Sequence, residues 1–320
     1  MLDFYQQLAA ALKQNAVVLA TVTSTTGSVP REIGAKMFIT ADSKTYGTIG
    51  GGAGEAKVYQ QALQILQTGE KQCVEIDLSG APQRQTQGIC GGTMFVWLEL
   101  WSGSESLSLV NQIIDILILG NPAAIVTPFE KHKKPYLVVG TQLITSLEIT
   151  GLIEPLLPPP TLLIIGAGHI AVPLAQIAKI AGFKIIVQDD RPEFATPERF
   201  PQASLVLTKP ITSIQEILET IPDLYVALVT RNYLQDLVAL RLLCNLQVQY
   251  IGMIGSVKRV STVYKNLHNE GYLSQLIHPI YAPIGLDIGA LTPEEIAVSI
   301  CAELIKVRRG GTGASLSENI

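Results

Sequence analysis

The chain has 320 residues, of which 48% are hydrophobic and 16% are charged, and its formal net charge is −4. This length favours two domains rather than one, and the composition allows large buried cores. The negative net charge argues against a general nucleic-acid binder and against a membrane-surface binder, since a net positive field would be needed to attract either partner.

We expect a cytoplasmic protein without a membrane partner. The opening residues, MLDFYQQLAAALKQN, have an acidic residue where a signal peptide needs a basic region. The most apolar window, residues 161–178, is interrupted by glycines, a proline and His169, so it predicts strand, turn and helix rather than a membrane span. The four cysteines, at positions 73, 90, 244 and 301, form neither a metal-type pair nor a disulfide framework, which fits a reducing compartment.

The first half of the chain predicts a smaller α/β domain with antiparallel pairing over residues 1–153. Its pattern alternates apolar helical segments with short β-branched runs. In chain order we expect a helix at 4–15, strands at 16–24 and 35–40 around the turn 27–34, a glycine-rich loop at 47–55, a helix at 56–69 and strands at 72–78 and 93–100, with 106–120, 123–129 and 135–140 adding to the same domain.

A proline-rich segment, EPLLPPPT at 154–161, predicts the linker between the domains. Three consecutive prolines cannot continue a helix or occupy a central strand, so they favour a stiff extended connector.

The second half predicts a Rossmann-like domain over 162–309, with a doubly wound parallel sheet. Near-continuous apolar strands alternate there with amphipathic helices, which is typical of a sheet covered on both faces. We expect strands at 161–166, 183–189, 203–207, 224–230 and 249–255, and helices at 169–182, 213–221 and 234–246. A last helix is expected at 292–309, capped by Thr292 and with Pro293 at its first position. Residues 310–320 are expected to form a flexible tail.

Gly166, Gly168 and Ala171 have the G-x-G-x-x-A spacing directly after the first of these strands. Such a turn lets the backbone approach a ligand and aims helix N-terminal amides at an anion. Asp189 and Asp190 end the next strand, where these folds often place a carboxylate for ribose hydroxyls. The alternative is a glycine turn that serves packing alone.

Two further strand ends are expected to meet the same crevice, Thr230–Tyr233 and Gly255–Arg259. Arg231, Lys258 and Arg259 lie near helix N-termini there and could hold a phosphate, or they could be solvated surface charges.

Nicotinamide-dependent hydride transfer is the first hypothesis for such a crevice, but it also needs an acid or base. His169 lies in the phosphate turn, an awkward place for that role. The remaining histidines show no spacing that marks a catalyst; they are His132, His268 and His278.

Cys90 lies in the stretch QGICGGTMFVW, between glycines and just before a predicted strand. Thiolate is a soft ligand and a nucleophile, and flanking glycines leave room for a bulky ligand. The alternative is an inert small residue beside a turn. Cys244 and Cys301 fall on predicted amphipathic helices and are expected in the core, whereas Cys73 is undecided.

Several segments together resemble the XdhC/CoxI family, the xanthine dehydrogenase accessory proteins. The matching segments are GSVPREIGAKM, GTIGGGAGE, GICGG, GAGHIA, TRNYLQD, YIGMIGSVKRV and PIGLDIGALTPEEIAVSICAELI. They extend over both predicted domains, and the last two segments of this list are long and specific.

The resemblance implies a carrier and insertion chaperone rather than a catalyst. Such a protein binds the molybdenum cofactor (molybdopterin), holds it while a cysteine desulfurase supplies its sulfido ligand, and delivers it to an apo-hydroxylase of the xanthine dehydrogenase, aldehyde oxidoreductase or CO dehydrogenase type. The crevice would then hold the pterin and phosphate of the cofactor, or a nucleotide. A homodimer is also expected. The alternative function is an NAD(P)- or nucleotide-dependent oxidoreductase.

The match has two departures. The family pattern Thr-Arg/His-x-His-x-x-Asp fits Thr230, Arg231 and Asp236, but Tyr233 stands at its second histidine. The loop GGGAGE also lacks the cysteine that some members carry, so thiol chemistry falls on Cys90, expected to contact the molybdenum. Glu55 could cap the helix that begins there or face the ligand.

The cofactor-binding residues that we expect are Cys90, Gly91, Gly92, Gly51, Gly52, Glu55, Gly166, Gly168, His169, Asp189, Thr230, Arg231, Gly255 and Ser256.

Overall fold

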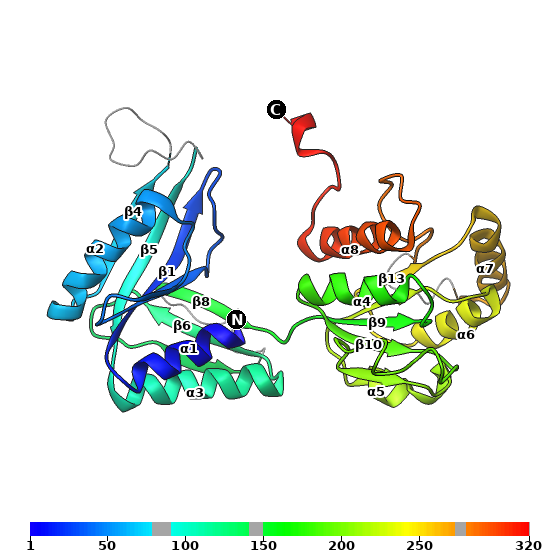
Figure 1. Cartoon of the computed structure of the whole chain (residues 1–320), viewed down its shortest axis with the longest axis horizontal. Helices are drawn as coiled ribbons and strands as arrows, with labels where there is room; N and C mark the ends of the chain where they lie inside the picture. Colours follow the sequence, from blue (N-terminus) through cyan, green and yellow to red (C-terminus); the bar gives the residue numbers. More distant parts are fainter. Residues whose placement is uncertain (79–90, 141–149, 273–279, 320) are drawn as a thin grey trace. The chain divides into compact units, whose positions relative to one another are not determined.

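The computed structural model describes residues 1–78, 91–140, 150–272 and 280–319. The chain divides into two compact units, Met1–Pro158 and Pro159–Ile320, called here the first and the second unit (Figure 1). Each unit has hydrophobic cores of its own. Among the described residues, no helix is both long and apolar enough to cross a membrane.

The first unit is built on a five-stranded sheet in which all strand pairs are antiparallel. Its central strand is buried over its first six residues, as a strand covered on both faces must be. In spatial order the strands are β3 (Thr45–Gly47), β2 (Lys36–Thr40), β1 (Val17–Thr26), β5 (Thr93–Trp101) and β4 (Gln72–Asp77).

Helices cover both faces of this sheet, because successive side chains of a strand point to opposite sides. Val18 and Val22 of β1 pack in one core with α2 (Gly52–Thr68). Val17 and Leu19 pack in a second core with α1 (Leu2–Leu12) and α3 (Gly103–Leu119). The segment 106–120, to which the sequence assigned no element type, therefore lies largely within α3.

A small antiparallel sheet completes the first unit and shares the core of α1 and α3. A partly buried ion pair between Lys36 of the larger sheet and Glu154 of the smaller one connects the two sheets. In spatial order the small sheet contains β7 (Tyr136–Val139), β6 (Ala123–Pro128) and β8 (Gly151–Leu156).

The proline-rich connector is shorter than the sequence predicted. β8 continues to Leu156 and the next strand, β9 (Thr161–Ile165), begins at Thr161, so only residues 157–160 connect the two strands. Pro155 fits within β8 because β8 is an edge strand, where a missing N–H costs no ladder hydrogen bond.

The second unit contains a six-stranded parallel sheet. Numbered within the unit, its spatial order is 3-2-1-4-5-6, which confirms the predicted doubly wound, Rossmann-like fold. The order reverses between β9 and β12. In space the strands are β11 (Leu205–Leu207), β10 (Lys184–Gln188), β9, β12 (Leu224–Leu228), β13 (Tyr250–Met253) and β14 (Ile280–Tyr281).

Helices cover both faces of the parallel sheet (Figure 1). On one face α4 (Ala171–Ile180) and α8 (Pro293–Arg309) pack over Leu162 and Ile164. On the other face Leu163 and Ile165 contribute to a core with η1 (Ile211–Ser213), α5 (Gln215–Glu219), α6 (Tyr233–Leu243) and α7 (Val257–Asn269).

The last helix begins as the sequence predicted. The Thr292 hydroxyl accepts from the Glu295 N–H at 3.2 Å and the Glu295 carboxylate accepts from the Thr292 N–H at 3.0 Å, a capping box followed by Pro293. Gly310 ends the helix in the left-handed conformation. The segment predicted as a tail contains a short 3₁₀-helix, η3 (Leu316–Asn319).

Candidate functional site

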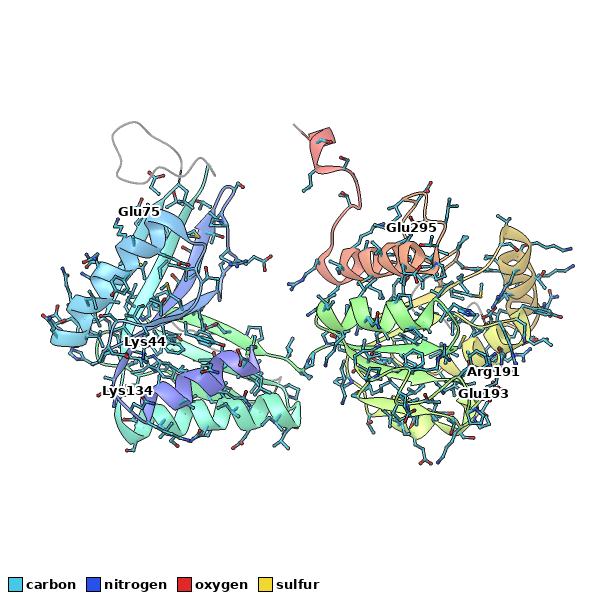
Figure 2. The ribbon with its side chains drawn as sticks, viewed as in Figure 1. Lys44, Glu75, Lys134, Arg191, Glu193 and Glu295 are labelled. Atoms are coloured by element: carbon cyan, nitrogen blue, oxygen red, sulfur yellow. The ribbon has the colours of Figure 1, made fainter. Side chains whose placement is uncertain are left out.

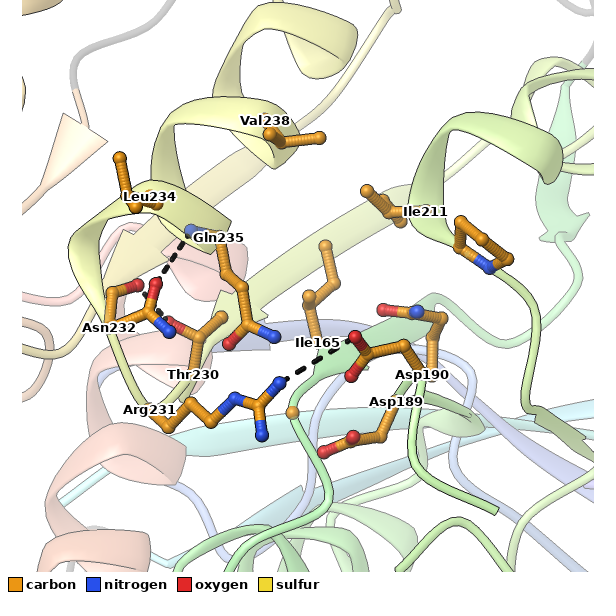
Figure 3. A pocket seen from close by; sticks show the side chains of 13 residues that line it. Ile165, Asp189, Asp190, Ile211, Thr230, Arg231, Asn232, Leu234, Gln235 and Val238 are labelled. Atoms are coloured by element: carbon orange, nitrogen blue, oxygen red, sulfur yellow. Dashed lines mark hydrogen bonds and ion pairs between the residues drawn. The ribbon is translucent and has the colours of Figure 1, made fainter.

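The candidate site of the second unit lies where the strand order reverses, at the carboxyl ends of β9 and β12. Ligands of doubly wound sheets bind in this crevice. A cavity of about 390 Å³ opens here (Figure 3). It is lined by Ile165, Gly166, Gln188, Asp189, Asp190, Pro210, Ile211, Thr230, Arg231, Asn232, Leu234, Gln235 and Val238.

Gly166 is required by the close approach of two backbone segments. Its φ is +101°, and a Cβ on it would lie 2.7 Å from the Val229 carbonyl oxygen and 3.1 Å from the Thr230 Cα. Gly168 differs, because a Cβ there would meet no atom within 4 Å in the part of the chain that the structure describes. The first glycine of the motif therefore serves packing, while the second leaves open space above the turn.

Asp189 is fully engaged by its own chain. One carboxylate oxygen accepts from the Ala167 N–H at 2.7 Å and from the Arg191 Nη2 at 2.7 Å, and the other accepts from the Arg191 Nε at 2.8 Å. Burial raises the pKa of Asp189, but these hydrogen bonds outweigh it and lower the pKa to about 2. Asp189 thus stays ionised and holds the glycine turn.

Asp190 remains open to the cavity. Its side chain is 46% exposed, and the nearest cation, Arg231, is 3.7 Å away. In Figure 3 the Gln235 side chain reaches from α6 into the space beside Asp190 and Arg231. Asp190, Arg231 and Gln235 are therefore among the polar groups that a ligand in this cavity can meet, together with Asn232.

The apolar wall of the cavity was not foreseen from the sequence. Ile211 comes from the short helix after β11, and Leu234 and Val238 come from α6. Leu234 is 58% exposed and Val238 is 38% exposed. Their spacing of four residues, on a helix whose other apolar residues face the core, is the signal that could have revealed this wall.

Thr230 and Arg259, both considered for ligand binding, belong to a buried network around Asp236. The Thr230 hydroxyl donates to Asp236 Oδ1 at 2.6 Å, and the Arg259 Nε donates to Asp236 Oδ2 at 2.7 Å. Arg259 Nη2 also donates to the Thr230 hydroxyl at 2.6 Å. Asp236 is fully buried. The Arg259 guanidinium is thus neither a solvated surface charge nor a free phosphate ligand; it links α7 to α6.

The remaining predicted residues of the crevice lie in or near an adjoining cavity of about 400 Å³, which shares Arg231 and Asn232 with the first. Tyr233 and Lys258 line it, together with Ser256. The Ser256 hydroxyl caps α7 by accepting from the Arg259 N–H. Gly255 precedes this cap, and a Cβ on it would press on the Arg259 side chain at 3.1 Å. Gly168 and the exposed His169 line neither of these two cavities.

In the first unit, glycines create open space at one end of the larger sheet. Gly51, Gly52 and Gly91 have φ values of +79°, +65° and +79°, and a Cβ on each would meet no atom of the described residues within 4 Å. Glu55 holds the loop before α2, since one of its oxygens accepts from the Thr48 hydroxyl at 2.5 Å and from the Gly51 N–H at 2.9 Å. Glu55 therefore stabilises the loop that precedes its own helix.

These glycine segments meet at a single turn, residues 27–30. A Cβ on Gly50 would lie 2.4 Å from Pro30 Cγ, and one on Gly92 would lie 2.4 Å from the Ser28 carbonyl oxygen. Gly91 pairs with Leu78, its N–H donating to the Leu78 carbonyl at 3.0 Å. The structure thus brings the loop 50–52 and residues 91–92 to the same end of the sheet.

Cys90 lies outside the described residues, as does His278. Cys301 is buried and Cys244 is partly buried, as expected for core thiols, and Cys73 is exposed. Burial raises the pKa of all three thiols, with a further contribution from Glu75 at Cys73. Among the described residues, no group of three or more His, Cys, Asp and Glu side chains is arranged to hold a metal ion.

Two family models match the chain. The XdhC Rossmann domain matches residues 162–304, and the XdhC and CoxI family model matches residues 10–77. Together they cover more than half of the chain.

The relatives extend the match to nearly the full length. The uncharacterized protein YqeB of Escherichia coli K12 is 28% identical over 98% of this chain, which spans only 47% of that protein. A Bacillus subtilis protein, named as a probable subunit of xanthine dehydrogenase, is 28% identical over 96% of this chain and 98% of its own length. The molybdenum cofactor insertion chaperone PaoD of E. coli is 23% identical over 93% of this chain and 86% of its own length.

A crystal structure described as a xanthine dehydrogenase from Bacillus halodurans has the same fold. It superposes with a TM-score of 0.77 at 25% identity, covering 99% of this chain and 98% of the other.

Proposed function

The chain belongs to the XdhC and CoxI family, and from this premise we propose that it is an accessory protein of molybdenum hydroxylases. It binds the molybdenum cofactor as cargo, holds it while a cysteine desulfurase installs the sulfido ligand, and delivers it to an apo-enzyme of the xanthine dehydrogenase type. The names of PaoD and of the Bacillus subtilis relative support this general role. Aldehyde oxidoreductases and CO dehydrogenases are alternative clients, and a homodimer is part of the same proposal.

The observation that carries the proposal is the open glycine end of the first unit. Gly51, Gly52 and Gly91 leave backbone that a large ligand can approach, and the turn 27–30 holds their loops together. Cys90 directly precedes Gly91 in the sequence. A bulky, sulfur-rich cargo fits both the space and a soft thiolate ligand.

Cys90 is proposed as the thiol that contacts the cargo because it directly precedes Gly91 in the sequence, whereas Cys301 is buried and Cys244 is partly buried. Cys73 is exposed, but it lies within β4, where it pairs with Trp97 of β5.

Substituting Cys90→Ser is expected to reduce the molybdenum and pterin that the chain retains through a desalting column by about tenfold or more, the equivalent of roughly 1.4 kcal/mol. Cys73→Ser is the matched control, since Cys73 is exposed and lies in the same unit; it should retain as much as the unchanged chain. Equal retention by both variants would contradict the role of Cys90.

The oxidoreductase alternative can be tested on the same preparations. Saturable oxidation of NADH or NADPH by the pure chain would support it, whereas cofactor retention without such oxidation supports the carrier.

A further inference from the structure

The cavity of the second unit distinguishes two adjacent carboxylates that the sequence leaves equivalent. Asp189 is 4% exposed, and its two oxygens together accept four hydrogen bonds, from Ala167 and Arg191. Asp190 is half-exposed, and among the described residues it forms one ion pair, with Arg231. The distance of 3.7 Å between the two charged groups is too long for a hydrogen bond. Of the two, Asp190 is therefore the carboxylate with acceptor capacity left for a ligand.

A carboxylate with two open oxygens can accept two hydroxyl donors, which is the pattern that a vicinal diol presents. Asp190 follows β10, next to the glycine turn after β9, and lines the same cavity as Gly166. A ribose bound there would donate hydrogen bonds from its 2′- and 3′-hydroxyls to the Asp190 carboxylate.

None of the described arginines near Asp190 is free to bind a phosphate on the 2′-hydroxyl. Arg191 is held by Asp189 and stacks on the Phe194 ring at 3.9 Å. Arg199 donates to the carbonyls of Ala167 at 3.0 Å and Phe194 at 2.8 Å. Arg231 offsets the single charge of Asp190, so a dianionic 2′-phosphate would face uncompensated negative charge.

The rest of the cavity suits the two ends of a nucleotide. Ile211, Leu234 and Val238 form an apolar wall against which a flat heterocycle can pack. Gly166 of the glycine turn also lines the cavity, and α4, which follows this turn, starts with no side-chain cap on its N-terminus. Those amides favour an anionic diphosphate.

We propose that this cavity binds a ribonucleoside 5′-diphosphate group with a free 2′,3′-diol, which Asp190 accepts, and that it rejects a 2′-phosphate. A free nucleotide and the nucleotide half of a larger cofactor share this chemistry. The site lies within the second unit, so the proposal does not depend on how the first unit handles its cargo.

Calorimetric titration of the full chain with matched ligand pairs tests the diol. ADP is expected to bind about tenfold more tightly than 2′-deoxy-ADP, because a hydrogen bond to a charged group is lost. NAD⁺ should bind at least about tenfold more tightly than NADP⁺, from which it differs only by the 2′-phosphate. CDP in place of ADP shows which base the apolar wall prefers, and binding of either nucleotide supports the proposal. Tighter binding of NAD⁺ than of ADP would point to the nucleotide half of a larger cofactor.

The variant Asp190→Asn should weaken ADP binding about tenfold and bring the ratio of ADP to 2′-deoxy-ADP affinity close to one. Glu193→Gln removes the same charge from an exposed position three residues away (Figure 2) and should change neither affinity. If Asp190 had only a structural role, Asp190→Asn would weaken the binding of ADP and of 2′-deoxy-ADP equally, and the ratio of the two affinities would not change.

Three results would overturn the proposal. They are no binding of ADP or CDP by a chain with unchanged circular dichroism, equal affinities for NAD⁺ and NADP⁺, and a ratio of ADP to 2′-deoxy-ADP affinity that Asp190→Asn leaves unchanged.

Discussion

Replacing Asp236 with alanine is expected to lower the free energy of unfolding of the second unit by about 3–5 kcal/mol. Asp236 is fully buried and neutralises Arg259, whose side chain is 20% exposed. Its loss leaves a guanidinium partly buried without its carboxylate, and the Thr230 hydroxyl loses its acceptor. With a typical denaturant dependence the urea midpoint falls by roughly 2 M.

The same two helices supply the matched control. Arg241 of α6 and Glu270, which directly follows α7, form a two-bond ion pair at 2.6 and 2.7 Å, but their side chains are 37% and 33% exposed. Glu270→Ala should cost only about 0–1 kcal/mol, because solvent screens the pair. Equal losses for Asp236→Ala and Glu270→Ala would contradict the assignment of Asp236 as the buried anchor.

The two units can be followed separately in this measurement. Both tryptophans, Trp97 and Trp101, lie in the first unit, so tryptophan fluorescence reports on that unit. Far-UV circular dichroism also reports on the parallel sheet. Asp236→Ala is expected to shift the transition seen by circular dichroism and to leave the fluorescence transition in place.

The substitution Gly166→Ala is expected to destabilise the second unit by about 3 kcal/mol or more and to abolish ligand binding in its cavity. A non-glycine residue at φ +101° is strained by roughly 1–3 kcal/mol. The new Cβ would also lie 2.7 Å from the Val229 carbonyl oxygen. The oxygen is a backbone atom and the backbone fixes the position of the Cβ, so no side-chain rotation relieves the contact. The strands β9 and β12 would have to separate at the crevice. Urea unfolding and nucleotide titration measure the two effects.

Gly168→Ala is the matched change within the same turn. Its Cβ would meet none of the described residues within 4 Å, so the free energy of unfolding should change by less than about 1 kcal/mol. Binding of a diphosphate should still weaken, because the methyl group enters the open space above the turn. If Gly166→Ala proved as stable as Gly168→Ala, the close approach of β9 and β12 would be contradicted.

The fold could be predicted where apolar periodicity is strong. The strands of the second unit are continuous apolar runs, and the last helix has a capping box, so both were placed within a few residues. The sequence analysis placed Lys258 and Arg259 near a helix N-terminus but gave no bounds for α7, because only two residues of this helix, Val263 and Leu267, are buried. The short strand β14, two residues long, is likewise too brief to leave a pattern.

The candidate site could be located from the sequence, but the roles within it could not. Spacing placed Asp189 and Asp190 together at a strand end, and nothing in their spacing tells which one the Arg191 side chain holds. Arg259 was considered for phosphate binding because it lies near a helix N-terminus, whereas its partner Asp236 lies 23 residues away in the sequence. Such assignments depend on which side chains meet in the folded chain.

The proposed accessory role is tested most directly by activation of a client. An apo-xanthine dehydrogenase is mixed with sulfurated molybdenum cofactor, with and without the pure chain, and xanthine oxidation is followed over time. The proposal predicts that the chain increases the rate and extent of activation, and that the Cys90→Ser variant does so less than Cys73→Ser. Activation that is the same with and without the chain would contradict the proposed function.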